Sequence, residues 1–305
     1  PAAVKTWFAQ RRAALVSQLG AVAAAFAITA NGGLACTVSS NLVVLTGTAP
    51  VEVGTIRVNG TPCPVTWTSV TGWSMPVPLA NGPNALLVEG CDAAGNPIAG
   101  LADTIQVTTD TTPESPLGQV MFSEIMFAPV VADAEYVELF NASTHTTFDL
   151  SGWRINGLNY TFPTGAVILP RGFLVLAKDL VACWNAYGMA VPLFGQFDGN
   201  LQSGGETLTL IRPGPTPAED LIVDRVTYGA AAPWPAGASG QGAALQLIDP
   251  AQDNSRVVNW SDNAPQWRFA SFTGNSGNVS RFSRFSLYFD NGGEVFLDDL
   301  ALVTG

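Results

Sequence analysis

Residues 119–155 read QVMFSEIMFAPVVADAEYVELFNASTHTTFDLSGWRI, and this stretch decides the fold of the longest part of the chain. Two runs in it, VMFSEIMF and EYVELF, are rich in the apolar and aromatic residues that favour strands. A polar turn follows and leads to DLSGW, where Gly152 is placed for a sharp bend before the next strand. We therefore predict two paired strands, a turn and a bend that open a β-sandwich.

The composition outside this stretch favours a β-rich protein with packed cores. The 305 residues predict about two domains at roughly 150 residues each. Charged residues make up 12% of the chain and hydrophobic residues 47%, which is enough apolar surface to build folded domains. The 31 glycines and 21 prolines predict many turns. Polarity comes mostly from Ser, Thr and Asn, which suits an extracellular or cell-surface location.

The charge balance excludes several classes of partner. The chain has 13 Lys and Arg against 24 Asp and Glu, a net charge of −11. Nucleic-acid binding requires a basic face that neutralises phosphates, so no nucleic-acid partner is expected, and anionic membrane surfaces are disfavoured for the same reason. No uninterrupted apolar run reaches the ~18 residues of a membrane-spanning helix, so no membrane insertion is predicted.

Changes of pattern along the chain divide it into five segments. Residues 3–26 have helical spacing of apolar residues and abundant Ala, and Asn31 to Gly33 end that helix. Short strands then recur every 8 to 12 residues, and Asn59-Gly60 marks a hairpin turn. The predicted segments are an N-terminal helix (1–33), a first sandwich (34–110), a linker (111–118), a second sandwich (119–262) and a group of strands (263–305).

The second sandwich resembles a known family. The strings SEI, EYVELFN, DLSGW, LPRGFLVLA, LQSGGETLTL, VDRVTYG and LQL occur in order between residues 119 and 262. In this order they resemble the lamin-tail domain, a small immunoglobulin-like β-sandwich. The resemblance implies a mainly β fold class of tandem immunoglobulin-like sandwiches with one N-terminal helix. It also implies that the acids of EYVELF have no catalytic role.

The flanking segments resemble modules of secreted bacterial proteins. Residues 34–110, with TGTAP, IRVNG, VTWTS and GPNALLVEG, resemble the bacterial Ig-like modules that stand beside lamin-tail domains. The string WFAQRRAALVSQL resembles the final helix of a CotH-type spore-coat kinase domain, which would make residues 1–33 a remnant of a preceding domain. The alternative is an amphipathic helix that packs on the first sandwich. Residues 263–305 resemble part of a carbohydrate-binding jelly roll.

A search for catalytic chemistry finds no complete set of residues. The only histidine, His145, lies between threonines in a turn, and we interpret it as a surface residue rather than a base for a nucleophile. Glu135 and Glu138 are three apart on a strand and therefore face opposite sides, so they cannot form one acid/base pair. Gly204-Gly205 has no following lysine and is no phosphate loop. We therefore predict that the protein is not an enzyme.

Metal and disulfide chemistry each leave two alternatives. Asp298 and Asp299 supply hard oxygen ligands that suit a structural calcium ion, the only cofactor considered; otherwise they are the solvated end of a strand. Cys63 and Cys91 lie in one predicted sandwich and are either bridged, as an extracellular setting favours, or buried free thiols.

The tryptophans raise carbohydrate binding as an alternative function. Trp67, Trp73 and Trp153 lie in strands and are expected in the core, whereas Trp234, between two prolines, is the best candidate for an exposed ring that stacks on a glycan. The favoured prediction is a structural or adhesive segment whose partners are other protein chains or copies of itself. The alternative is a carbohydrate-binding accessory module, with polysaccharide as its partner.

Overall fold

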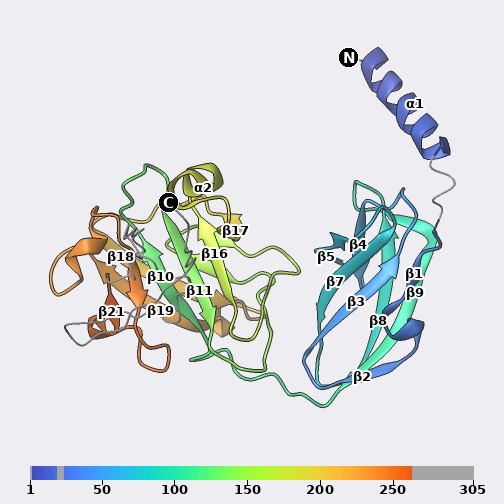
Figure 1. The fold of residues 1–305 in the computed structure, drawn as a ribbon. Helices are drawn as coiled ribbons and strands as arrows, with labels where there is room; N and C mark the ends of the chain where they lie inside the picture. The colour runs from blue at the N-terminus through green and yellow to red at the C-terminus, as the bar shows by residue number, and fades with distance from the viewer. Residues whose placement is uncertain (1, 19–23, 263–305) are drawn as a thin grey trace, which may run out of the picture. The chain divides into compact units, whose positions relative to one another are not determined.

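The computed structural model describes residues 2–18 and 24–262, and this part of the chain is mainly β (Figure 1). The predicted fold class is therefore confirmed. Helix α1 spans Ala2–Gln18, compared with the predicted 3–26; residues 24–26 are not helical and lead into strand β1 (Ala27–Ile28). Trp7 and Phe8 on α1 are 53% and 62% exposed, and both interpretations of this helix stay predictions.

The first sandwich consists of two antiparallel layers with the strand orders β1-β3-β7-β6 and β2-β9-β8-β4-β5, in which only β2 and β9 run parallel. Its core includes Leu45, Met75, Val88 and Val107, all with no exposed surface. These residues alternate with exposed ones along their strands, as expected for a sandwich with one solvated face per sheet. The remaining strands are β2 (Cys36–Val38), β3 (Leu42–Thr48), β4 (Thr55–Val58), β5 (Thr61–Cys63), β6 (Thr66–Trp67), β7 (Gly72–Pro78), β8 (Gly82–Cys91) and β9 (Pro97–Thr109).

Local turn chemistry in this sandwich follows the sequence. Asn59 and Gly60 join β4 to β5 with φ angles of 50° and 79°, both in the left-handed region that these two residue types tolerate. The predicted hairpin is therefore confirmed.

Trp73 packs closely against Gly47 in the core of the first sandwich. They are opposite each other on β7 and β3, and Trp73 is 1% exposed. A Cβ atom added to Gly47 would overlap the Trp73 indole and the carbonyl oxygen of Ala27. The glycine therefore makes the space that the buried indole fills.

Trp67 does not follow the prediction of a core residue. It pairs with Trp73 across β6 and β7, but β6 is an edge strand, and Trp67 is 38% exposed. Trp153, by contrast, is 3% exposed, in agreement with the prediction.

Cys63 and Cys91 are free thiols, which corrects the expectation of a bridge. Cys63 lies on β5 and Cys91 on β8, and β4 lies between these two strands in the sheet. Strands two positions apart are separated by roughly 9–10 Å, beyond the reach of a disulfide. Burial raises the pKa of both thiols.

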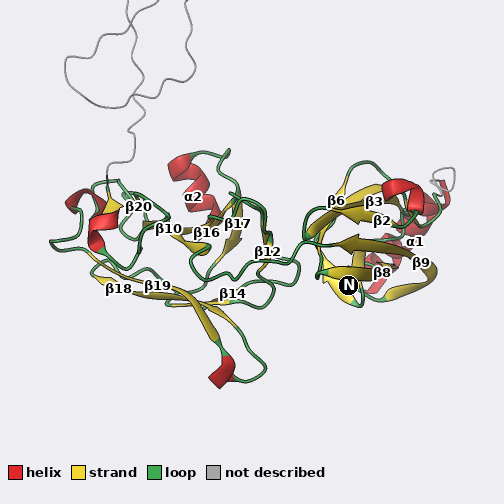
Figure 2. Cartoon of the chain, turned by 90° about the horizontal axis from the view of Figure 1, so that it is seen from below, coloured by secondary structure: helices red, strands yellow, loops and turns green. Residues whose placement is uncertain are grey.

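The second sandwich packs a six-stranded sheet, in the order β17-β16-β11-β10-β20-β21, against a four-stranded sheet, β14-β13-β18-β19. Figure 2 shows that strands and loops dominate here, together with the α-helix α2 (Leu180–Tyr187). The six-stranded sheet contains β10 (Val120–Met126), β11 (Tyr136–Asn141), β16 (Phe173–Ala177), β17 (Leu193–Gln196), β20 (Leu245–Leu247) and β21 (Trp260–Ser261). The other strands are β12 (Phe148–Asp149), β13 (Arg154–Asn156), β14 (Tyr160–Thr161), β15 (Val167–Ile168), β18 (Gly205–Arg212) and β19 (Leu221–Gly229).

The opening stretch of the second sandwich forms β10 and β11, which pair antiparallel as predicted. A bulge between Phe122 and Glu124 shifts the register, so Phe122 and Ile125 both enter the core while Glu124 lies on the other face. Gly152 has a φ of 74°, which confirms the predicted bend. The bulge therefore decides which side chains of β10 face outward.

We predict that Gly47→Ala destabilises the first sandwich by about 2 kcal/mol, because the added methyl group overpacks the contact with Trp73. Gly204→Ala is the control: Gly204 is exposed, and a Cβ atom there meets nothing within 4 Å. Urea denaturation followed by tryptophan fluorescence measures both variants. Equal stability of the two variants would contradict the assigned role of Gly47.

Candidate functional site

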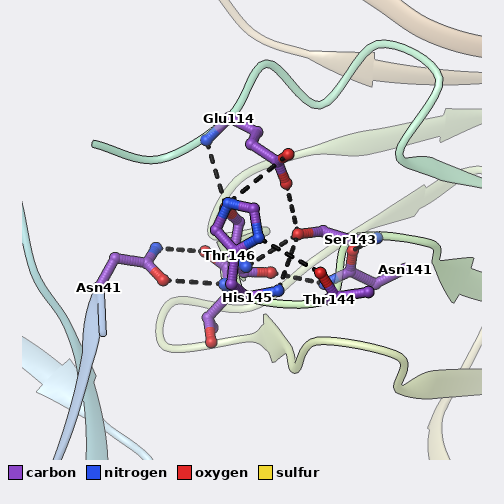
Figure 3. A network of polar contacts seen from close by, with 8 residues as sticks. Asn41, Glu114, Asn141, Ser143, Thr144, His145 and Thr146 are labelled. Carbon is purple, nitrogen blue, oxygen red and sulfur yellow. Dashed lines mark hydrogen bonds and ion pairs between the residues drawn. The ribbon is translucent and has the colours of Figure 1, made fainter. Parts of the chain in front are cut away.

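A polar network joins Asn41, which immediately precedes β3, to the turn that follows β11 (Figure 3). Asn41 is 3% exposed, and its side-chain Nδ2 donates to the carbonyl oxygen of Thr147 at 2.6 Å. The backbone N–H of Thr147 donates in turn to Asn41 Oδ1 at 2.9 Å. One amide side chain of the first sandwich thus binds the backbone of the second in the way that a neighbouring strand would.

Asn141, at the end of β11, holds the turn that presents Thr147. Its Nδ2 donates to the carbonyl oxygens of Thr146, Ile168 and Leu169 at 2.8, 3.2 and 2.9 Å, and its Oδ1 accepts from Ser143 N at 3.0 Å. Asn141 and Thr146 have no exposed surface. Buried polar groups are costly when unpaired, so this network fixes the conformation of the turn.

Glu114 attaches the preceding segment to the same turn. The Ser143 hydroxyl donates to the Glu114 carboxylate, and the backbone N–H of Glu114 donates to Thr146 Oγ1 at 3.3 Å. The Ser143 hydroxyl lowers the pKa of Glu114; burial opposes this effect, and the nearby His145 adds to it. A carboxylate that accepts such a bond is stabilised in its ionised form.

The segment 111–118, predicted as a linker, is fastened to both sandwiches. Asn81 Nδ2 donates to Thr112 Oγ1 at 2.6 Å on the side of the first sandwich, and Glu114 binds the turn of the second. Pro64 and Gly165 also meet, because a Cβ atom on Gly165 would overlap the Pro64 ring. The junction therefore has contacts besides the covalent connection.

Glu114, Ser143 and His145 are the residue types of a hydrolytic triad, but their connections differ from one. His145 Nε2 is 3.6 Å from Glu114 Oε1, whereas the Ser143 hydroxyl donates to Glu114 and not to the imidazole. A triad requires the imidazole to accept the proton of the serine. Ser143 is also 3% exposed, and the His145 side chain is 57% exposed, as expected for a surface residue. The arrangement orders a turn and does not activate a nucleophile.

The acids of the opening stretch lie on different sides of the sheet. Glu135 accepts a hydrogen bond from Leu201 N at 3.0 Å, while Glu138 accepts one from the Ser123 hydroxyl at 2.8 Å. The prediction that Glu135 and Glu138 do not form one pair is therefore confirmed. Sequence reasoning missed that Glu138 is directly opposite Glu124, because the bulge in β10 sets that register.

The other predicted site residues gather at no common site in residues 24–262. Trp234 is half-buried beside Trp260, with 6.4 Å between ring centroids, so its ring is not the exposed platform that was expected. Asp298 and Asp299 lie outside the described residues. Within the described ranges, no three His, Cys, Asp or Glu side chains are grouped so that they could hold a metal ion. In the same ranges no helix combines the length and hydropathy needed to cross a membrane.

Comparison with known proteins identifies the central part of the chain. Residues 113–230 match the family model of the Lamin Tail Domain. This match confirms the lamin-tail resemblance over those residues, although the expected segment extended to residue 262. The resemblances of residues 34–110 to a bacterial Ig-like module and of residues 1–33 to a CotH-type protein stay predictions.

Other comparisons add little. No curated protein matches the chain. Among solved structures, it is similar to a Bacteroides ovatus protein, SGBP-B of the mixed-linkage glucan utilization locus, solved in complex with a mixed-linkage heptasaccharide. The identity is 12% and the TM-score 0.18, over 64% of this chain and 43% of that one. The chain therefore spans less than half the length of that protein, and a likeness this weak supports no functional argument.

Proposed function

We propose that this chain is a non-catalytic structural or adhesive segment of a secreted or cell-surface bacterial protein. In this proposal the two sandwiches act as a coupled spacer that takes part in assembly or protein–protein contact. The observation that carries it is the pair of hydrogen bonds between the Asn41 side chain and the Thr147 backbone. A junction with buried polar contacts favours one arrangement of two modules, which is what a spacer requires.

The bonding of the polar groups supports a role without catalysis. Glu114, Ser143, Asn141 and Thr146 form hydrogen bonds with one another or with the backbone. Catalytic groups instead need a free face toward a substrate. The polar residues of the junction are therefore better suited to holding structure than to reacting.

Strand edges offer the surfaces for protein partners. In the second sandwich β17 and β21 border one sheet, and β14 and β19 border the other. Phe194 on β17 is 41% exposed, and Ile222 on β19 is 44% exposed. Exposed edges with apolar side chains can accept a strand from another chain, so other proteins or copies of this chain are the proposed partners.

Carbohydrate binding is the second candidate, and the exposure of Trp67 favours it. This ring is 38% exposed at a sheet edge beside uncharged Thr66 and Thr68, so it offers an apolar face with polar neighbours. It takes the place of the half-buried Trp234 as the stacking residue in this proposal.

Whether the two sandwiches unfold together can be tested by comparing Asn41 with Asn84. Each of these side chains donates one hydrogen bond to the backbone of another residue and accepts one from it. Asn84 also donates to and accepts from one backbone residue, Ala80, at 2.8 and 3.0 Å, but within the first sandwich. We predict that wild type and Asn84→Ala each unfold in one calorimetric transition, whereas Asn41→Ala separates into two. Each hydrogen bond contributes about 1 kcal/mol, so uncoupling of about 2 kcal/mol is expected. A single transition for Asn41→Ala would contradict the coupling.

Two measurements separate the two candidate functions: light scattering at increasing protein concentration, and tryptophan fluorescence at increasing glucan concentration. We predict growth of particle mass with protein concentration in light scattering, and no change of tryptophan fluorescence on adding soluble β-glucans. Growth in wild type and in Trp67→Ala alike supports assembly. A strictly monomeric protein whose fluorescence responds to glucan, with the response lost in Trp67→Ala, would replace the structural proposal with carbohydrate binding. A monomer without any response would contradict both candidates.

A further inference from the structure

One row of side chains crosses the face of the six-stranded sheet that points away from the main core. Successive strand pairs place directly opposed residues along this row: Ser261, Gln246, Glu124, Glu138, Val175 and Leu193. Glu124 and Glu138 are neighbours in it, on β10 and β11. Like charges directly opposite each other on antiparallel strands are destabilising, so this pair needs a physical explanation.

Within the described part of the chain, the two carboxyl groups receive hydrogen bonds from neutral donors. Glu124 Oε1 accepts from the Tyr136 hydroxyl at 2.6 Å and from Gln246 Nε2 at 3.2 Å. Glu138 Oε1 accepts from the Ser123 hydroxyl at 2.8 Å. The ion pairs of the described residues include neither acid. The bulge at Ser123 is what brings its hydroxyl to Glu138.

Among the described residues, the groups packed around the pair supply no compensating positive charge. On α2, the Tyr187 ring packs edge-on against Tyr136, with 5.2 Å between centroids. At the other end of β11, Arg171 lies 5.0 Å above the ring of Phe140 and donates to the Ala142 carbonyl oxygen. Strands β16 and β17 contribute apolar Val175 and Leu193 to the row, and β20 and β21 contribute Gln246 and Ser261.

We propose that Glu138, which lies directly opposite Glu124 among neutral partners, carries a proton when the sheet is closed, and that loss of this proton loosens the contact between β10 and β11. We call these two acids the latch. The contact between β10 and β11 is tight at low pH, when Glu138 is protonated, and weaker at higher pH, when Glu138 is ionised. Two neighbouring carboxylates in a poorly solvated site resist double ionisation, as paired carboxyl groups elsewhere do. Strand β11 carries both Glu138 and Asn141, but the latch uses none of the hydrogen bonds of the Asn41 junction and does not depend on the proposed function.

The pH range over which the latch weakens follows from the pKa of Glu138. Burial raises the pKa of Glu138 to about 7; the Ser123 hydroxyl opposes this rise, and the charge of Glu124 adds to it. The folded protein therefore holds this proton more tightly than the unfolded chain, whose glutamates ionise near an ordinary pKa of about 4.5. Stability is greatest below the ordinary value and falls as the pH rises through about 7.

The test compares thermal unfolding at pH 5 and pH 8 in the full chain. We expect the unfolding midpoint of wild type to fall by roughly 5–10 °C, from the size of the pKa shift and the usual dependence of midpoint on stability. Glu138→Gln removes this fall, since the amide oxygen still accepts from Ser123 and has no proton to lose. Glu138→Gln is then more stable than wild type at pH 8.

Glu219→Gln is the matched control. Glu219 is exposed in the same sandwich, and its carboxylate accepts from the Thr216 hydroxyl at 2.7 Å, as Glu138 does from Ser123. We expect this variant to keep the wild-type fall between pH 5 and 8. A wild type without the fall, or a Glu138→Gln variant that falls in parallel with it, would overturn the proposal.

A second measurement does not depend on any variant folding. Carbon-13 NMR of wild type follows the side-chain carboxyl carbons, and the latch requires one of them to titrate near pH 7. Over the same range, the protection of the β10 and β11 amides relative to the intrinsic, base-catalysed exchange rate must fall. Titration of every glutamate between pH 4 and 5, or unchanged protection across the midpoint, would equally overturn it.

Discussion

The amide of Asn41 is the interaction on which the arrangement of the two sandwiches depends. It satisfies both polar groups of the Thr147 backbone, at a place where Thr147 is 2% exposed. Each such bond contributes only about 1 kcal/mol in net terms, so the junction cannot rely on a single contact. The junction is instead held by several linked hydrogen bonds. Asn141 shapes the turn, Ser143 binds Glu114, and Glu114 fixes the segment that leads out of the first sandwich.

A second constraint operates inside the lamin-tail sandwich, at the bulge in β10. By adding one residue, the bulge lets Phe122 and Ile125 both reach the core and turns Ser123 and Glu124 to the other face. Two consequences follow from this one irregularity. The core of the sandwich is continuous along β10, and the opposite face acquires a pair of opposed carboxyl groups with a serine hydroxyl between the strands.

The sequence was most informative where local patterns decide the structure. Asn59-Gly60 predicts its hairpin and Gly152 its bend because only certain residues tolerate a positive φ. The order of strings in residues 119–262 predicts the lamin-tail fold, which the match over 113–230 confirms. The features that the sequence could not reveal are those that depend on which strands are neighbours in a sheet. Cys63 and Cys91 appeared suitable for a bridge until β4 was found between them, and Trp67 is exposed because its strand lies at an edge. Asn41 had no local signal, since its partner is 106 residues away.

The most direct test of the central claim is nitrogen-15 relaxation of the backbone amides in the unmodified chain. If the Asn41 junction couples the sandwiches, amides of β3 and β7 report the same rotational correlation time as those of β11 and β18. The Thr147 amide also exchanges slowly with solvent. Separate, shorter correlation times for the two sandwiches, together with rapid exchange at Thr147, would contradict the account of this chain as a coupled spacer.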